Sequence, residues 1–318
     1  MKHPRIVAIG GGTGLYNLLR GLRQYPADLT SIVAMTDDGG STGKLRTEFG
    51  VLPPGDIRRS IVALSESPDR MFELFQYRFQ RGGVAGHSFG NLFITALREI
   101  TGSDEQAIDE AAELLRVHGT VLPVTLDDRQ LVAELDDGQT VTGQSRIDLS
   151  HYEQSRRIVA LRLNQPATAN PRALAALQAT DFIVLGPGDL FGSLIANLIV
   201  PGIASAIAKS RARLLFVCNL MTKRGETSGF TVIQYVLTLH QYLAGRIIDS
   251  VLYSQLKPRK TVRAAYAAEG AAPVRATLGL NSNLKPRYHR IPMATRGDLL
   301  HHDPTKLARA IWSIVQSS

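Results

Sequence analysis

The chain has 318 residues, of which 44% are hydrophobic and 20% are charged. This length and composition fit one large α/β domain or two modest ones and exclude a mainly disordered chain. The 36 Lys and Arg residues against 28 Asp and Glu give a net charge of +8, which favours anionic partners. A single cysteine, Cys218, excludes an internal disulfide and a cysteine zinc site, and it indicates a reducing compartment.

Two classes of partner are not expected. The basic residues are scattered without the interleaved aromatics of nucleic-acid-binding motifs, so we expect no nucleic-acid partner. The apolar stretch 190–208 has the length of a membrane span, but it contains Gly192, Pro201 and Gly202. We therefore expect a buried helix broken near Pro201 and no membrane span. Because an apolar run begins at Ile6, leaving no room for a signal peptide, we expect a cytoplasmic protein.

Apolar runs that end in glycine-rich loops dominate the N-terminal third. The run 5–9 precedes a glycine loop at 10–14 and a leucine-rich helical pattern. The run 31–35 ends in a second polar loop at 36–43. Helical patterns follow at 56–65, 69–79, 91–101 and 104–118.

From 120 to 163 the period changes to that of short strands, which predicts a small β-rich insertion. The α/β pattern then resumes with strands predicted at 182–185, 214–218 and 247–253 and helices at 171–178 and 231–243. Strands that alternate with helices predict an α/β fold with a Rossmann-like, doubly wound, mostly parallel sheet. We expect one domain over 1–318, with the insertion at 120–163 inside it.

The unusual loops all follow predicted strands. In an open parallel sheet the ligand lies beyond the carboxyl ends of the strands, where the strand order reverses. The first loop, Gly10, Gly11, Gly12, Thr13 and Gly14, suits a phosphate because glycine lets backbone N–H groups approach oxygen. The dinucleotide fingerprint is incomplete, however, and a tight turn that only packs a helix is the alternative.

The second loop places Asp37 and Asp38 beside Ser41 and Thr42. Three roles are open for the two carboxylates: contact with ribose hydroxyls, binding of Mg²⁺, or capping of the turn. The stretch fails the Walker pattern because Asp38 and Leu45 stand where that pattern needs Gly and Ser or Thr.

A rigid loop at 53–55 leads into a helix with Asp56 as its expected N-cap. As an alternative, Asp56 joins Asp37 and Asp38 around a cation, while Arg58 or Arg59 meets a phosphate.

Residues 86–90 match the G-x-S-x-G nucleophile elbow of hydrolases. The elbow needs a preceding strand, whereas a helix and a loop are predicted there, so we do not expect a hydrolase. The better interpretation is a helix start at which His87, Ser88 and Asn91 face an anion.

Two further loops belong to the second half of the sheet. Gly186 and Gly188 follow the strand at 182–185, and Asn219 and Lys223 follow the strand at 214–218. We expect Asn219 to contact a base edge or a sugar hydroxyl and Lys223 a phosphate. The alternatives are an ordinary βα turn and a surface lysine.

These loops, taken in order at 9–15, 37–43, 53–56, 86–92 and 186–203, resemble the YvcK-type gluconeogenesis factors over nearly the whole chain. That family belongs to the superfamily of 2-phospho-L-lactate transferases, which move a phospholactyl group from a guanosine diphosphate donor to a deazaflavin. The resemblance implies a CofD-like fold and a nucleotide-diphosphate cleft. Its matched positions are Gly12, Thr13, Asp37, Asp38, Asp56, Asn91, Gly186 and Asn219.

YvcK-type proteins bind UDP-sugars such as UDP-N-acetylglucosamine and support cell shape, wall synthesis and growth on gluconeogenic carbon sources. The resemblance therefore implies a cytoplasmic nucleotide-sugar-binding regulator that requires no cofactor, with protein partners in wall synthesis or carbon metabolism and a homo-oligomeric state such as a dimer. Two positions depart from the family: Asp189 replaces a frequent Ser or Thr, and His301-His302 replaces a frequent Arg-His.

The alternative function is a transferase that acts on a nucleotide-diphosphate-linked donor. In that hypothesis Asp37, Asp38 and Asp56 hold Mg²⁺, which neutralises the diphosphate as the leaving group departs.

Overall fold

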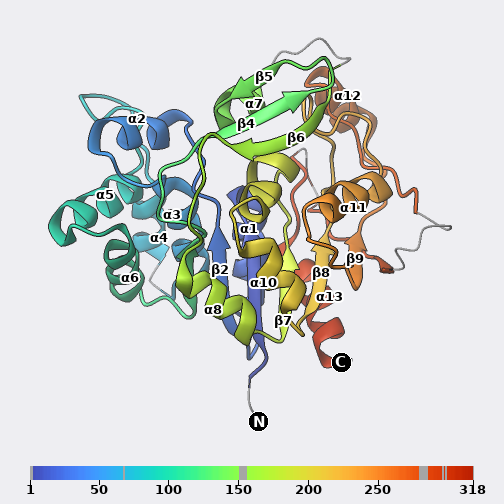
Figure 1. Cartoon of the computed structure of the whole chain (residues 1–318), viewed down its shortest axis with the longest axis horizontal. Helices are drawn as coiled ribbons and strands as arrows, with labels where there is room; N and C mark the ends of the chain where they lie inside the picture. Colours follow the sequence, from blue (N-terminus) through green and yellow to red (C-terminus); the bar gives the residue numbers. More distant parts are fainter. Residues whose placement is uncertain are drawn as a thin grey trace.

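A seven-stranded parallel sheet forms the centre of the computed structural model, which describes residues 3–66, 69–149, 156–278, 286–295, 297 and 299–317 (Figure 1). The strand order is β10-β9-β8-β7-β1-β2-β3, and every pairing is parallel. The bounds are β1 (Arg5–Gly10), β2 (Asp28–Val33), β3 (Thr120–Pro123), β7 (Phe182–Leu185), β8 (Arg213–Val217), β9 (Ser250–Tyr253) and β10 (Arg287–Arg290). The predicted doubly wound α/β fold is confirmed.

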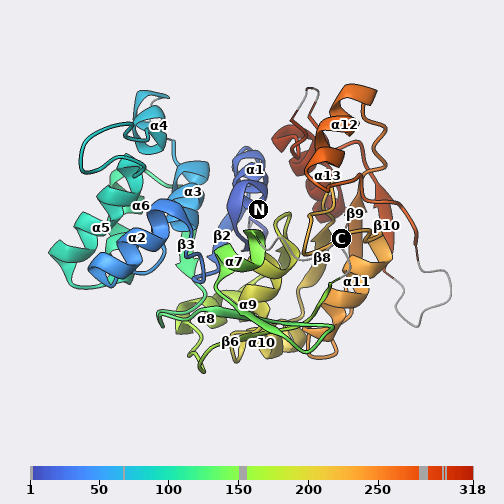
Figure 2. The same ribbon diagram turned by 90° about the horizontal axis from the view of Figure 1, so that it is seen from above.

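Helices cover both faces of this sheet, so its central strands are buried and read as continuous apolar runs. Helices α1 and α13 pack on one face, and α8 and α10 cover the other (Figure 2). The helices are α1 (Gly12–Leu22), α2 (Gly40–Phe49), α3 (Pro54–Leu64), α4 (Asp69–Gln76), α5 (Phe89–Thr101), α6 (Asp104–Leu114), α7 (Gln144–Leu149), α8 (Pro171–Ala179), the π-helix η1 (Leu190–Ile195), α9 (Ala196–Leu198), α10 (Ile203–Lys209), α11 (Val232–Gln241), α12 (Lys260–Ala268) and α13 (Pro304–Gln316).

The strand order reverses between β1 and β7. The chain first builds β2 and β3 on one side of β1 and then adds β7 to β10 on the other side. The loops after β1 and β7 therefore leave the same edge of the sheet as neighbours, and Gly186 N donates to Ile9 O at 2.9 Å. This reversal is the point at which open α/β sheets bind their ligands.

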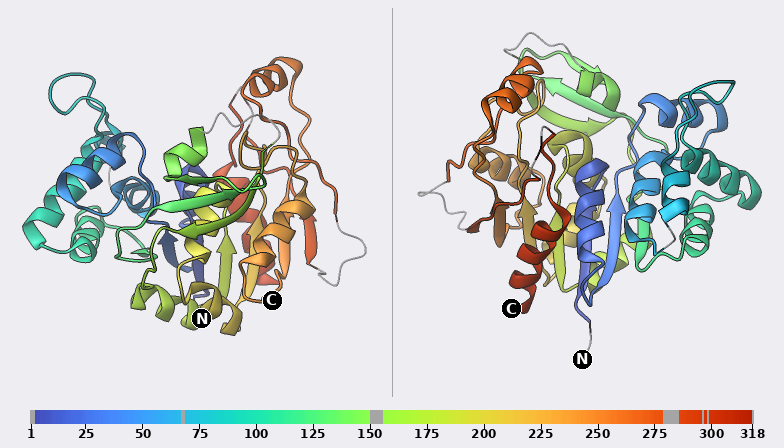
Figure 3. Two further views of the ribbon diagram at one scale, coloured as in Figure 1. Left: turned by 45° about the horizontal axis from the view of Figure 1, so that its top comes forward. Right: turned by 180° about the vertical axis from the view of Figure 1, so that it is seen from behind.

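The small sheet is shorter than the predicted insertion. It contains β4 (Leu131–Leu135), β5 (Thr140–Thr142) and β6 (Ile158–Leu163), all antiparallel, and Figure 3 shows it with α7 beyond the carboxyl ends of the main strands. The predicted start at 120 is wrong because β3 pairs with β2 in the main sheet. Residues 150–155 of the predicted insertion lie outside the described residues.

Two further predictions concern helices. The predicted loop at 36–43 is helical from Gly40 onward, a start that its polar, glycine-rich first turn concealed. The predicted break near Pro201 is confirmed, since Leu190–Leu198 and Ile203–Lys209 are bent by 72° relative to each other. No single helix in the described ranges is long and apolar enough to cross a membrane, and only this bent pair passes that test jointly.

A buried polar network joins α2, α3 and α5. Arg58 Nε donates to Asn91 Oδ1 at 2.8 Å, and Asn91 Nδ2 donates to Ser41 Oγ at 3.2 Å. Ser41 Oγ also lies 3.0 Å from His87 Nδ1, and Ser88 Oγ caps α5 by accepting from Asn91 N. Burial lowers the pKa of Arg58 to about 10, so the guanidinium stays charged at neutral pH. These side chains satisfy one another and hold the three helices together.

We predict that Asn91→Leu lowers the free energy of unfolding by about 3 kcal/mol, because it removes the buried acceptor of Arg58 Nε and the buried donor to Ser41 Oγ. Urea unfolding measures the loss. Thr95→Val, one turn further along α5, removes a hydroxyl that donates only to Asn91 O and is expected to cost less than about 1 kcal/mol. An Asn91→Leu protein of wild-type stability would show that the network does not hold the helices.

Candidate functional site

A cavity of about 380 Å³ lies beyond the carboxyl ends of β1 and β2, at the reversal of the strand order. Its walls come from the loops after β1, β2 and β7 and from α3, α7 and η1. Four carboxylates and one guanidinium provide its charged groups. The lining residues are Gly12, Ala34, Asp37, Gly39, Gly40, Asp56, Arg59, Gln144, Ser145, Asp148, Asp189, Gly192 and Ser193.

The glycine loop after β1 packs directly against the loop after β7. A Cβ atom on Gly14 would overlap the carbonyl of Pro187, so only glycine allows this approach. Gly12 has a φ of +67°, a conformation that side chains with a Cβ rarely adopt. The N-cap of α1 is Gly11, which offers no side-chain acceptor to the first turn. The Asp56 carboxylate instead accepts from Gly12 N in this first turn, so the positive end of α1 faces the cavity beside an acidic group that the protein itself supplies.

Asp37 and Asp56 stand on neighbouring walls of the cavity. Burial raises the pKa of Asp37, and the nearby charge of Asp56 adds to the increase. Burial also raises the pKa of Asp56, although Asp56 pairs with Arg59 at 3.1 Å and accepts a hydrogen bond from Gly12 N. In the described part of the chain, no basic side chain comes within ion-pair distance of Asp37. Among the four carboxylates that line the cavity, Asp37 is thus the one without an ion pair in the described part of the chain.

Asp56 differs from its predicted role as an N-cap. Helix α3 already begins at Pro54, so Asp56 lies inside the first turn and points to the cavity. Asp38 points elsewhere: its Oδ1 accepts from Ser145 N at 2.7 Å and from Ser145 Oγ at 2.5 Å. Asp38 therefore anchors the start of α7.

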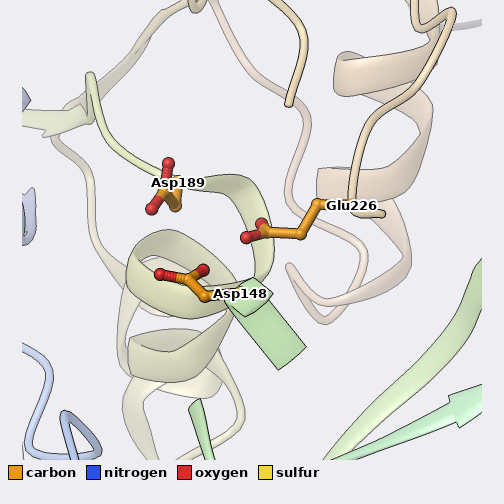
Figure 4. Close-up of side chains that lie close together, drawn as sticks. All are labelled: Asp148, Asp189 and Glu226. Atoms are coloured by element: carbon orange, nitrogen blue, oxygen red, sulfur yellow. The ribbon is translucent and has the colours of Figure 1, made fainter. Parts of the chain in front are cut away.

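Lys223 lies among three carboxylates beside the cavity. Its Nζ is 2.7 Å from Asp189 Oδ2 and 2.8 Å from Glu226 Oε1, and it also pairs with Asp148. Figure 4 shows the three acidic side chains converging. Among the described residues they are the group of three whose oxygens lie within 4.8 Å of one another, as metal ligands would. Burial lowers the pKa of Lys223, but the carboxylates of Glu226, Asp189 and Asp148 outweigh it and raise the pKa.

A second cavity of about 220 Å³ adjoins the first and shares Asp189 with it. Asn219 Nδ2 donates to Gly188 O at 3.0 Å, while its buried Oδ1 has no hydrogen-bond partner among the described residues. His302 Nε2 lies 3.2 Å from Cys218 O, and burial lowers the pKa of His302 to about 4. His302 is therefore neutral and donates through Nε2. Tyr266 adds an aromatic side chain to this cavity.

The predicted ligand residues fall into three groups. Those that line the first cavity are Gly12, Asp37 and Asp56, and those that line the second are Thr13, Gly188 and Asn219. The remaining ones line neither cavity: Gly10, Gly11 and Gly186 in the packed loops, Asp38 before α2, Thr42 within α2, Ser41, Arg58, His87, Ser88 and Asn91 in the buried network, and Lys223 among its carboxylates.

Sequence reasoning missed the residues that α7 and η1 contribute to the cavity. Gln144, Ser145 and Asp148 follow Gly143 in the stretch that we interpreted as a β-rich insertion, where no known motif marks them. Ser193 lies in the apolar stretch that we interpreted only as a buried helix. Glu226 follows Lys223 by three residues, and that spacing is the one sequence signal that indicates their ion pair.

The comparisons with known proteins agree with this architecture. Residues 6–290 match the family described as 2-phospho-L-lactate transferase CofD. The chain is 39% identical over 316 residues to a gluconeogenesis factor of Halalkalibacterium halodurans, covering 98% of this chain and 96% of that relative. It is 36% identical over 317 residues to the gluconeogenesis factor of Bacillus subtilis, covering 99% of each.

A crystal structure of a UPF0052 family protein from Bacillus halodurans has the same fold, with a TM-score of 0.92 and 38% identity. The match covers 98% of this chain and 99% of that chain. The resemblance to the gluconeogenesis factors is thereby confirmed, and the chain belongs to the CofD family.

Proposed function

We propose that this protein binds a nucleoside diphosphate compound of the UDP-sugar class, such as UDP-N-acetylglucosamine, and acts as a regulator through that binding. The observation that carries the proposal is the pair of adjoining cavities on either side of two packed glycine loops at the strand-order reversal. A ligand with two different ends joined by a charged linker suits this arrangement. By family, we extend the proposal to cell shape and the use of gluconeogenic carbon sources.

The chemistry of each part favours one orientation of the ligand. We place the diphosphate near the N-terminus of α1, where the helix dipole favours negative charge and a bound cation would offset Asp56, which already accepts from Gly12 N. The base occupies the smaller cavity, in which Tyr266 offers an aromatic surface and Asn219 Oδ1 an unpaired acceptor. The sugar occupies the larger cavity, where Asp37 and Asp56 accept hydrogen bonds from hydroxyl groups.

The residues of the larger cavity also fit a divalent cation. Mg²⁺ prefers carboxylate oxygens and phosphate, and Asp37 and Asp56 are two partly buried carboxylates whose pKa burial raises. When bound, Mg²⁺ would neutralise the charge between these carboxylates and a diphosphate. Asp38 is left out of this set because Ser145 occupies it.

The transferase remains the second candidate, and the same carboxylates are the observation that favours it. A metal-dependent assay with UDP-N-acetylglucosamine and guanosine-diphosphate-linked donors separates the two functions. Recovery of unchanged donor after long incubation supports the binder, and metal-dependent turnover supports the transferase.

We predict that Gly12→Val weakens binding of UDP-N-acetylglucosamine by at least about tenfold, or about 1.4 kcal/mol, because a branched side chain enters the phosphate loop. Isothermal titration measures the affinity. Gly50→Val is the matched control, since Gly50 also has a positive φ, of +64°, but lies at the exposed end of α2. Equal affinities for both variants and wild type would place the diphosphate elsewhere, and no binding by wild type up to millimolar ligand would refute the proposed function.

We predict opposite effects of Asp37→Asn on binding and on stability. Binding in the presence of Mg²⁺ weakens by roughly 1–3 kcal/mol, and the loss disappears with a chelator. Because burial raises the pKa of Asp37 in the folded state, its charge costs stability above the unfolded pKa of about 4. The variant is therefore more stable than wild type at pH 7, and the difference vanishes as the pH falls below about 4.

Asp38→Asn is the control for this experiment. Asp38→Asn removes the charge next to Asp37 but keeps an oxygen that accepts from Ser145. We therefore expect the Mg²⁺ dependence of binding and the free energy of unfolding to stay at their wild-type values. Ligand titration with Mg²⁺ and with chelator measures the affinity of wild type and both variants. Thermal unfolding at pH 7 and pH 4 measures their stability. A metal effect confined to Asp38→Asn would contradict our assignment.

A further inference from the structure

Lys223 joins three segments that are far apart in sequence. Its ammonium pairs with Asp148 of α7, with Asp189 after β7 and with Glu226 before α11. Two of these carboxylates, Asp148 and Asp189, line the larger cavity, whereas Lys223 lines neither cavity. Lys223 therefore affects a ligand through the acidic residues that it holds.

Three carboxylates this close together repel one another unless a cation lies between them. Their oxygens lie within 4.8 Å of one another, and the Glu226 side chain is only 1% exposed. Coulomb repulsion is strongest at the buried Glu226 and weaker between Asp148 and Asp189, whose side chains are 29% and 37% exposed. The Lys223 ammonium is the group that allows Asp148 and Asp189 to stay together on one wall.

Helix α7 is attached at both ends by side chains. Asp38 accepts two hydrogen bonds from Ser145 in its first turn, and Lys223 pairs with Asp148 in its last turn. Six residues are too few for a helix to be stable by itself, so contacts with the rest of the protein must hold α7 in place. Gln144, Ser145 and Asp148 of this helix form one wall of the larger cavity.

We propose that Lys223 is a positioning residue whose ammonium acts as a built-in bridging cation, which closes α7 over the larger cavity. The three carboxylates have the spacing of metal ligands, and the lysine supplies the positive charge that a divalent ion would otherwise supply. The effect on α7 is independent of any ligand. The consequence for binding rests on the proposed function.

Hydrogen exchange of the free protein tests the bridge. In Lys223→Ala the amides of 144–149 are expected to exchange at least about tenfold faster than in wild type, while those of α10 are unchanged. Lys209→Ala, which removes an exposed lysine of α10, is the matched control and leaves α7 unchanged. If Lys223→Ala does not fold, Asp148→Asn removes the ion pair between α7 and Lys223 but keeps an oxygen that accepts from Gln144 Nε2, and it is expected to give the same acceleration. Unchanged exchange in the folded variant would overturn the proposal.

A rescue by Mn²⁺ distinguishes charge from packing. Millimolar Mn²⁺ added to Lys223→Ala is expected to restore the slow exchange of 144–149, because the ion bridges the same three carboxylates. The double variant Lys223→Ala/Asp148→Asn lacks the carboxylate of α7 and stays fast. If Mn²⁺ does not slow exchange in Lys223→Ala, the lysine acts through its packing and the bridging role is wrong.

Titration with UDP-N-acetylglucosamine separates this proposal from the proposed function. If α7 closure matters for the site, Lys223→Ala weakens binding by about tenfold, with faster dissociation. Faster exchange together with no binding by wild type would refute the nucleotide site and leave the bridge intact. Binding by wild type together with unchanged exchange in Lys223→Ala would refute the bridge alone.

Discussion

The contact between the loops after β1 and β7 is the constraint on which the rest of the site depends. The chain completes β2 and β3 on one side of β1 and then crosses over to place β7 on the other side. The two loops then leave the same edge, and Gly14 has no Cβ to keep the Pro187 carbonyl away. Their contact sets the N-terminus of α1 between two cavities, one on each side of the packed loops.

Overall charge and local charge have opposite signs in this protein. The chain carries +8, yet the larger cavity is lined by four carboxylates and one arginine. The excess of basic residues therefore says little about what enters the cavity, and a free anion would be repelled from its acidic walls. A diphosphate is compatible with this site only at the helix terminus or with a cation beside it.

Glycine made the framework of the site predictable, because strands followed by glycine loops mark the carboxyl edge of a parallel sheet. The same signal did not separate ligand contacts from internal ones. Ser41 and Asn91 lie next to glycines as Gly12 and Asp37 do, but they pair with His87 and Arg58 inside the protein. Such pairing depends on how α2, α3 and α5 pack together, which local sequence does not encode.

The carboxylates around the cavity differ in how their charge is balanced. Most of them form ion pairs within the described part of the chain, and one does not. Asp148, Asp189 and Glu226 share the Lys223 ammonium, and Asp56 has Arg59. Within the described residues, Asp37 has no ion pair: the Gly39 amide, the Thr42 hydroxyl and the more distant Arg59 charge favour its ionised form, but burial still raises its pKa. A buried charge left without a cation costs stability and contributes nothing to the packing of the fold. Asp37 is therefore the carboxylate at which we propose that a ligand hydroxyl or a metal ion binds.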